Sequence, residues 1–282
     1  MHPRTDTLID LALEEDAAFG DVTSESIFAP DHASNAHISA GEELTVCGLE
    51  IARRVFQRVD PSLRVRMNYR DGERASKGKP VMRVSGATIS LLLAERTALN
   101  FLQRLSGIAT LSRRFADAAQ QAGSGVRIVD TRKTTPAWRA LEKYAVRCGG
   151  CFNHRLSLGE HVLIKDNHIA AAGSVRKAVM RARAVAPHGA RIEVEAASRS
   201  EVRAALNAGA DIIMLDNMTP QQIRSAVKLI ARKALVEVSG GVRLETVKDY
   251  ALPGVDVISV GALTHSAPAV DLSMTVTAAR KK

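Results

Sequence analysis

The chain has 282 residues, of which 46% are apolar and 24% are charged, and its formal net charge is +9. This composition is typical of a globular protein, and the length suits one large domain or two ordinary ones. No apolar run approaches the ~20 residues that span a bilayer. Acidic residues also stand near the start, where a signal peptide needs an apolar stretch. We therefore expect a cytoplasmic protein with no membrane partner.

Charge and cysteine content narrow the function classes further. The positive charge admits nucleic acid as a partner. However, the few aromatic residues are not interleaved with basic ones, and no zinc-finger or RNA-recognition signature occurs. We therefore expect no nucleic-acid partner. The three cysteines, an odd number, argue against a disulfide framework.

The first hundred residues predict an α+β domain. Short strand-like stretches from Ala36 to Arg83 are broken by glycine turns, and the apolar-periodic segment from Glu50 to Val59 predicts a helix among them. A longer helix, Thr88 to Gly107, carries a leucine-rich stripe beside a polar stripe that includes Arg96. A further helix is expected from Thr110 to Ala122. We place the N-terminal domain at residues 1–107 and expect the tail, 266–282, to pack back on it.

A repeating order of strand, polar tip and helix begins at Val126. Its strands read VRIVDTRK, HVLIKDNH, RIEVEA, DIIMLDN, ALVEVSGG and DVISVGA. Continuous apolar strands alternating with helices predict βαβ units around a parallel sheet. Polar or glycine residues stand at the C-terminal end of every strand, which favours an active site built as in an α/β barrel. Because the span is shorter than the ~250 residues of a full barrel, we expect an incomplete TIM-like α/β barrel at residues 108–265.

Basic residues cluster between Asp130 and His168. A solvated helix face after Pro136 explains Arg139, Lys143 and Arg147. The remaining basic residues stand where strands give way to loops, which is where α/β proteins place their sites. They predict a pocket for a small, multiply anionic ligand, and the alternative is scattered surface charge. The residues are Arg132, Lys133, His154, Arg155, His161, Lys165 and His168.

Acidic and glycine residues at other strand ends extend this site. Glu195 and Asp216 follow adjacent strands, and they either hold Mg²⁺ or neutralise neighbouring cations. Glycine turns on the last two strands let backbone N–H groups approach a phosphate. With these turns we group Ser239, Gly240, Gly261 and His265 as a candidate phosphate site.

Cys148, Cys151 and His154 form a C-x-x-C-x-x-H pattern. A closed zinc site needs a fourth ligand, and the chain has no second cysteine pair. The pattern also does not open a helix after a strand, as a thioredoxin-like motif does. A tight loop is the favoured interpretation over zinc or redox chemistry.

Several segments together resemble the quinolinate phosphoribosyltransferase family, the carboxylating nicotinate-nucleotide pyrophosphorylases. They are GDVTS, ERTALNFLQRLSGIAT, TRKTTP, KYAVRCGG, NHR, LIKDNHI, AGADIIMLDN and ISVGALTHSAP. The resemblance implies an N-terminal α/β sandwich, a six-stranded incomplete barrel and a homodimer in which each N-terminal domain closes the partner's barrel, with higher oligomers possible. It also implies a magnesium-dependent reaction of quinolinate with phosphoribosyl pyrophosphate that yields nicotinate mononucleotide, pyrophosphate and carbon dioxide.

The resemblance also implies a role for each matching residue. Quinolinate would be held by Arg132, His154, Arg155 and Lys165, and by Arg96 of the second subunit. The catalytic residues would be Lys133, Glu195 and Asp216, of which the two acids would bind the metal. The phosphoribosyl pyrophosphate would contact Lys133, Asn217, Ser239, Gly240, Gly261 and His265.

Two departures from the family pattern and two alternative functions remain. Cys151 stands where the family usually has a third glycine, and Ala196, Ala197 and Ser198 replace a stretch that commonly contains an acid and Asn. A paralogous group associated with molybdate transport shares TRKT and the His-Arg pair, although the intact LIKDNH favours the quinolinate enzyme. The alternative of another enzyme class is an aldolase-like barrel in which Lys165 forms a Schiff base.

Overall fold

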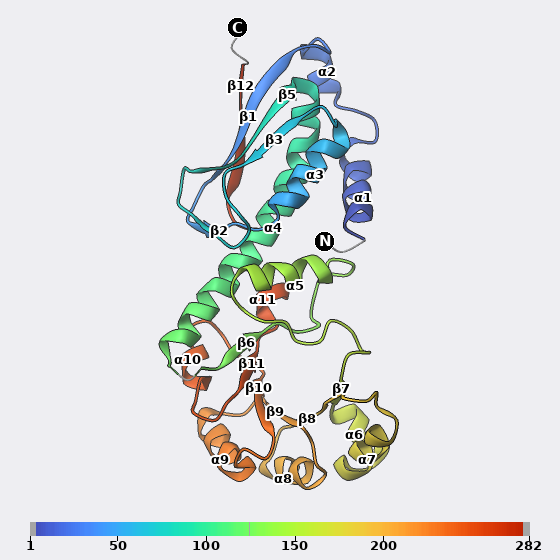
Figure 1. The fold of residues 1–282 in the computed structure, drawn as a ribbon, viewed down its shortest axis with the longest axis vertical. Helices are drawn as coiled ribbons and strands as arrows, with labels where there is room; N and C mark the ends of the chain where they lie inside the picture. Colours follow the sequence, from blue (N-terminus) through green and yellow to red (C-terminus); the bar gives the residue numbers. More distant parts are fainter. Residues whose placement is uncertain (1–3, 124, 279–282) are drawn as a thin grey trace. The chain divides into compact units, whose positions relative to one another are not determined.

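The computed structural model describes residues 4–123 and 125–278 in two compact units (Figure 1). The first unit contains the described residues up to Arg113, the segment Ala140–Gly150 and the described residues from Ala267 onward. The second contains Arg114–Arg139 and Cys151–Ser266. The predicted bounds, 1–107 and 108–265, differ from these units chiefly in the segment 140–150, which lies in the first unit and not with the barrel strands.

The first unit is built on an antiparallel sheet in the order β12-β1-β5-β3. The four strands are β1 (Ala33–Ala40), β3 (Arg64–Met67), β5 (Pro80–Ala87) and β12 (Leu272–Ala278), and β2 (Leu44–Thr45) pairs separately with β4 (Arg74–Ala75). The C-terminal strand β12 thus pairs with β1, near the start of the chain. The helices of this part are α1 (Thr5–Ala17), α2 (Val22–Ile27) and α3 (Leu49–Val59). Alternate residues of β1 and one face of α3 are buried, as a sheet covered by an amphipathic helix requires.

The long helix α4 (Thr88–Gln121) does not break at Gly107, so the prediction of two helices there was wrong. A side chain at Gly107 would place its Cβ 2.0 Å from the carbonyl oxygen of Pro268. This glycine therefore allows the tail to approach the helix closely, and it does not end the helix.

Helix α5 (Arg139–Cys148) belongs to the first unit from Ala140 onward. Glu142 is fully buried and accepts a hydrogen bond of 2.8 Å from the guanidinium of Arg104. Lys143 is also buried, so the prediction that it lies on a solvated helix face was wrong. Burial of such groups is tolerated where charged partners and hydrogen bonds are supplied.

The second unit is organised around a six-stranded sheet in the order β6-β11-β10-β9-β8-β7, with every pairing parallel. All six predicted strands are confirmed: β6 (Arg127–Val129), β7 (Val162–Ile164), β8 (Ile192–Ala196), β9 (Ile212–Asp216), β10 (Leu235–Ser239) and β11 (Val257–Ser259). The helices after β7 are α6 (Asp166–Ala172), α7 (Val175–Val185), α8 (Arg199–Asn207), α9 (Pro220–Ile230), α10 (Val247–Tyr250) and α11 (Ala262–His265). Since β6 and β7 are the two ends of the sheet order, the strands form an incomplete barrel, as predicted.

Among the described residues, none of the helices combines the length and the apolar character that crossing a membrane would require.

Candidate functional site

A cavity of about 580 Å³ opens at the carboxyl ends of the parallel strands of the second unit. This is the edge at which α/β barrels place their active sites. Its lining consists of Thr131, Arg132, Lys133, His154, Arg155, Leu163, Lys165, Glu195, Met214, Asp216, Asn217, Glu237, Ser239, Gly240, Gly241 and Ser259. Cationic groups and acids therefore share one space.

Two guanidinium groups dominate one part of this cavity. The side chain of Arg155 is held by a hydrogen bond of 3.0 Å from its Nη1 to the carbonyl oxygen of His161. Burial, followed by the positive charge of Arg132, lowers the pKa of Arg155. The positive charges of Arg132 and Arg155 are held close together and away from bulk water, and an anion bound between them would reduce their repulsion. This part of the cavity is suited to carboxylates.

Asp130 fixes the loop that carries these groups. It is fully buried, and its two carboxylate oxygens accept hydrogen bonds from the backbone N–H of His154 at 2.9 Å and from the side chain of Asn153 at 2.6 Å. The residues after β6 and the His154–Arg155 pair are thereby joined within the second unit.

Two histidines and two glutamates form a cluster of which His154 and Glu237 line the cavity. The Nε2 atom of His154 is 3.4 Å from Glu193 and 3.5 Å from Glu237, and Nε2 of His161 is 3.1 Å from Glu193. Burial and the neighbouring charge of Glu193 raise the pKa of Glu237 to about 8. Burial also acts to raise the pKa of Glu193, but the facing imidazoles of His154 and His161 outweigh it and lower that pKa. The two acids therefore carry one proton near neutral pH, with the charge on Glu193 beside His154.

Glu195 and Asp216, which also line the cavity, stand at the ends of adjacent strands. The Nζ of Lys165 lies 2.6 Å from Oε2 of Glu195. Asp216 accepts a hydrogen bond of 2.6 Å from the side-chain amide of Asn217. Glu195 and Asp216 line the cavity together with Lys165 and Asn217, so their carboxylate oxygens can contact a ligand that enters it.

Gly240 and Asn217 form a tight corner of the cavity. Gly240 has φ +94°, and a Cβ there would lie 2.2 Å from Oδ1 of Asn217. Asn217 itself has φ +53°, and its N–H donates to the carbonyl oxygen of Ser239 at 2.9 Å. Only glycine at position 240 permits this approach, and such turns expose backbone N–H groups to a phosphate.

The structure brings most of the predicted site residues together. Arg132, Lys133, His154, Arg155, Lys165, Glu195, Asp216, Asn217, Ser239 and Gly240 all line the cavity. Gly261 and His265 do not line it but stand next to Lys133, because a Cβ on Gly261 would lie 3.1 Å from the His265 ring and 3.2 Å from Cδ of Lys133. Arg96 is exposed on α4 in the first unit and is not among the lining residues.

Sequence reasoning missed Glu193 and Glu237. Side chains two residues apart on a strand point to the same face. Glu193 precedes Glu195 by two positions, and Glu237 likewise precedes Ser239. Alternation counted back from the polar tips would have identified both acids.

The C-x-x-C-x-x-H pattern is not a single site. Cys148 belongs to a group with Cys47 and Asp71 in the first unit, whereas His154 belongs to a group with His161 and Glu193 in the second. Cys151 is buried. The expectation that the pattern is not a zinc site agrees with this division.

Both departures from the family pattern have a local structural account. Gly150 is the only residue of 149–151 with a positive φ, so Cys151 occupies a backbone conformation open to any residue. Ser198 is the N-cap of α8 and accepts from the backbone N–H of Glu201, while the carboxylate of Glu201 accepts from that of Ala197 at 2.7 Å. The Ala196–Ser198 stretch thus closes into a helix start.

An open α/β barrel with clustered cations, paired acids and a glycine corner at its carboxyl end is an enzyme architecture suited to polyanionic small molecules. Residues 108–275 match the family model described as "Quinolinate phosphoribosyl transferase, C-terminal domain", and residues 21–106 match the corresponding N-terminal domain. The chain belongs to the quinolinate phosphoribosyl transferase family.

Individual relatives agree over nearly the whole chain. The chain is 42% identical to "Probable nicotinate-nucleotide pyrophosphorylase [carboxylating]" of Bacillus subtilis (strain 168), with 98% of this chain and 94% of that protein covered. It is 40% identical to "Quinolinate phosphoribosyltransferase [decarboxylating] 2a, mitochondrial" of Nicotiana tabacum, covering 98% and 83%. The crystal structure of NadC from Streptococcus pyogenes superposes with a TM-score of 0.94 at 40% identity, covering 99% of each chain.

Proposed function

We propose that this protein transfers the phosphoribosyl group of phosphoribosyl pyrophosphate to quinolinate, with loss of carbon dioxide, and so forms nicotinate mononucleotide and pyrophosphate for NAD biosynthesis. One observation carries the proposal. In a member of this family, the cavity gathers Arg132, Lys133, Arg155 and Lys165 around a space that three acids also line. Both substrates are polyanions, and such a cavity is complementary to them.

The cationic residues position the dicarboxylate. Arg132 and Arg155 would each pair with a quinolinate carboxylate, because the planar guanidinium matches a carboxylate with two parallel hydrogen bonds. His154 would border the same carboxylate and hold Arg155 in place, because its Nδ1 accepts from the backbone N–H of Arg155 at 2.8 Å while its Nε2 faces Glu193 at 3.4 Å. Lys165 would exchange its salt bridge with Glu195 for the substrate. The pyridine nitrogen is thereby aimed at the ribose carbon that carries pyrophosphate.

Transfer requires little covalent chemistry from the protein. As the pyrophosphate leaves, positive charge develops on the ribose and negative charge on the leaving oxygens. Glu195 and Asp216 would stabilise the first, and Lys133 would stabilise the second. The N–H groups at Ser239 and Gly240 would hold the 5′-phosphate, with Asn217 against the ribose and with Gly261 and His265 behind Lys133.

Decarboxylation follows from the same geometry. Quinolinate has a carboxylate on the carbon beside the ring nitrogen, and nicotinate lacks it. Once the nitrogen bears ribose, it is a cation adjacent to that carbon. The electron pair released when carbon dioxide departs remains next to this positive charge, and the carbon then takes a proton.

We extend the proposal to Mg²⁺. The cavity fits this ion in part: Glu195 and Asp216 supply two carboxylates, and Mg²⁺ commonly takes only one or two from the protein, with the remaining ligands from substrate phosphates and water. Glu195 is paired with Lys165, so the lysine would have to turn toward the substrate first. When bound, the ion would neutralise charge on the pyrophosphate oxygens.

The proposal includes a homodimer with shared sites. Arg96 is an exposed cation of a largely apolar helix, and the family resemblance assigns it to the partner's quinolinate site. A higher oligomer is compatible with this arrangement. We also propose that the enzyme acts in the cytoplasm, a compartment in which free thiols such as its three cysteines are the usual state.

The alternatives have less support. A Schiff base requires an uncharged amine, whereas Lys165 forms a salt bridge with Glu195. The two relatives described above are named as a nicotinate-nucleotide pyrophosphorylase and a quinolinate phosphoribosyltransferase, and neither name refers to molybdate transport.

The test is an assay with Mg²⁺, phosphoribosyl pyrophosphate and either quinolinate or nicotinate. We expect nucleotide to form with quinolinate alone. Equal product from nicotinate would show that the cavity does not select the dicarboxylate, and the absence of product from both would overturn the proposal.

A further inference from the structure

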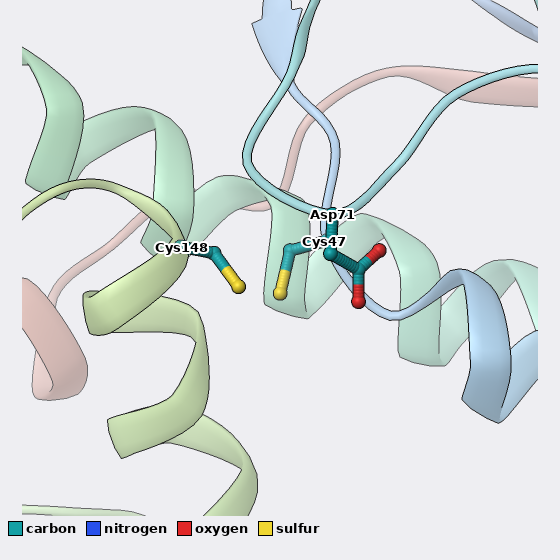
Figure 2. A group of neighbouring side chains, drawn as sticks. All are labelled: Cys47, Asp71 and Cys148. Carbon is teal, nitrogen blue, oxygen red and sulfur yellow. The ribbon is translucent and has the colours of Figure 1, made fainter.

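The side chains of Cys47 and Cys148 lie next to each other within the first unit (Figure 2), whereas the cavity residues belong to the second unit. Cys47 lies in the loop between β2 and α3, and Cys148 is the last residue of α5. Their sulfur atoms and a carboxylate oxygen of Asp71 all lie within 4.8 Å of one another. Figure 2 shows the two sulfur atoms side by side, one from the end of α5 and one from the loop that carries Cys47. We propose that this pair is an oxidative modification site, at which a peroxide converts the two thiols into a disulfide.

The backbone on both sides of the pair is fixed. The N–H of Cys47 donates to Oγ of Ser106 at 2.9 Å, and the same hydroxyl donates back to the carbonyl oxygen of Cys47 at 3.1 Å. The carbonyl of Cys148 accepts from Arg113 at 3.3 Å. The loop containing Cys47 and the end of α5 are therefore both tied to α4 by hydrogen bonds.

Two glycines allow the end of α5 to come this close to its neighbours. A Cβ on Gly149 would lie 2.5 Å from the carbonyl oxygen of Ala109, and one on Gly72 would lie 3.2 Å from that of Cys148. The backbone around Cys148 is therefore closely packed on two sides. A pair held in this way loses little conformational entropy when it forms a bond.

The two thiols differ in exposure and in acidity. Cys47 is fully buried, whereas Cys148 is partly exposed. The hydrogen bond from Cys47 lowers the pKa of Cys148, and burial raises that of Cys47. The thiolate is the nucleophile in such chemistry, so Cys148 reacts first and Cys47 resolves the product.

The chemistry balances in two steps. The Cys148 thiolate attacks one oxygen of hydrogen peroxide, the O–O bond breaks, and hydroxide leaves as a sulfenic acid forms on Cys148. The Cys47 sulfur then attacks the Cys148 sulfur, the S–O bond breaks, and the thiol proton joins the departing oxygen as water. In total, two thiols and one peroxide give one disulfide and two waters.

Asp71 makes a metal site the weaker interpretation. One of its oxygens accepts from the backbone N–H groups of Gly48 and Leu49, each at 3.1 Å, and the other accepts from the hydroxyl of Tyr144 at 2.9 Å. Its carboxylate is thus engaged in holding the start of α3 and the side of α5. That leaves two sulfur atoms, short of the four ligands of a structural zinc site.

The experiment treats the full-length reduced protein with a small excess of hydrogen peroxide, blocks remaining thiols by alkylation, and maps the peptides by mass spectrometry. We expect wild type and Cys151→Ser to lose two hydrogens and to yield a Cys47–Cys148 linked peptide. Cys47→Ser should stop at a sulfenic acid on Cys148 that dimedone traps, and Cys148→Ser should form no disulfide. Cys47→Ala provides a second variant if the serine is not tolerated, and circular dichroism checks that each variant folds.

Three results would overturn the proposal. The first is that peroxide leaves the thiols of the native protein unmodified but oxidises those of the denatured protein. Another is a disulfide that joins Cys148 to Cys151. The third is stoichiometric zinc in the purified protein that is lost in Cys47→Ala and Cys148→Ser.

Discussion

The ammonium of Lys165, at the end of β7, lies 2.6 Å from the carboxylate of Glu195, at the end of the neighbouring strand β8. Lys165 remains 47% exposed in its side chain, whereas Glu195 is 17% exposed. The pair is therefore open on the lysine side, and an entering carboxylate can compete for the ammonium. Release of Lys165 to the substrate would free Glu195 at the moment it is needed.

Glu195→Gln keeps the shape of this side chain and removes its charge. We expect kcat to fall by roughly 10²–10³-fold, because a preorganised charge facing the developing positive ribose is lost. The KM for quinolinate should change little, since Lys165 is then unpaired and available to it. Glu245→Gln, at an exposed position after β10, is the matched control and should retain wild-type kcat. An unchanged kcat in Glu195→Gln would remove this residue from the catalytic set.

Gly240→Ala and Gly241→Ala separate backbone strain from a steric effect at the phosphate corner. Both glycines have a positive φ, but a Cβ on Gly240 would lie 2.2 Å from Asn217, whereas one on Gly241 would meet nothing within 4 Å. Steady-state kinetics should show a KM for phosphoribosyl pyrophosphate raised at least about tenfold more in Gly240→Ala, which corresponds to about 1.4 kcal/mol. Equal effects from both substitutions would mean that contact with Asn217 is not what position 240 provides.

The proton held by Glu237 makes stability depend on pH. Its pKa is raised to about 8 by burial and by Glu193. A carboxyl group whose pKa is higher in the folded than in the unfolded state stabilises the folded state fully when the pH is below its unfolded-state pKa. This contribution is lost as the pH rises through its folded-state pKa. Glu193, whose pKa is lowered, stays ionised throughout this window. We therefore expect Glu237→Gln to become progressively more stable relative to wild type between about pH 5 and pH 8.

Denaturant unfolding at several pH values measures this difference, which should reach a few kcal/mol at the alkaline end. Glu245→Gln provides the exposed control and should track wild type. A constant difference between Glu237→Gln and wild type across the window would contradict the shared-proton description.

Much of the barrel can be predicted from the sequence. Its strands are continuous apolar runs separated by helices. In a parallel sheet the C-terminal ends of all strands lie at one edge, so the polar residues at those ends come together. For this reason the sequence alone predicts Lys165, Glu195 and Asp216 as site residues. Glu193 and Glu237 were overlooked because each sits inside an apolar run, although strand alternation places them on the cavity side.

Other features depend on contacts between distant parts of the chain. Gly107 looks in the sequence like the end of a helix. Glycine is needed there because the carbonyl oxygen of Pro268, far along the chain, lies too close for a side chain. The burial of Lys143 likewise depends on what packs against α5. Nothing in the local pattern around Cys148 indicates that its neighbour is Cys47 and not Cys151. Local propensity is a weak guide where tertiary contacts decide the outcome.

Subunit exchange tests the proposed dimer. Arg96→Ala and Arg155→Ala proteins should each be nearly inactive, and mixing them should restore activity, because a mixed dimer has one site with both arginines intact. Random exchange of equal amounts would make about half of the dimers mixed, so about a quarter of all sites would be active. If proven exchange brings no recovery, Arg96 does not serve a partner's site.

Oxidation of the Cys47–Cys148 pair should raise stability. The disulfide would close a loop of about 100 residues, for which chain-entropy models give roughly 4–5 kcal/mol before any native strain. Guanidinium unfolding of oxidised and reduced Cys151→Ser protein measures the gain. Cys47→Ala treated in the same way should show none, and a loss of stability on oxidation in Cys151→Ser would indicate that the pair is not preorganised.

The most direct test of the central claim follows the carboxylate beside the ring nitrogen of quinolinate, labelled at its carbon, in wild type and in Lys133→Ala. The account predicts that wild type releases labelled carbon dioxide only when phosphoribosyl pyrophosphate and Mg²⁺ are present, in equal amount to the nucleotide formed. It also predicts that Lys133→Ala, which lacks a cation lining the cavity, releases almost none. Release without phosphoribosyl pyrophosphate, or undiminished release by Lys133→Ala, would contradict the assignment of this reaction to the cavity.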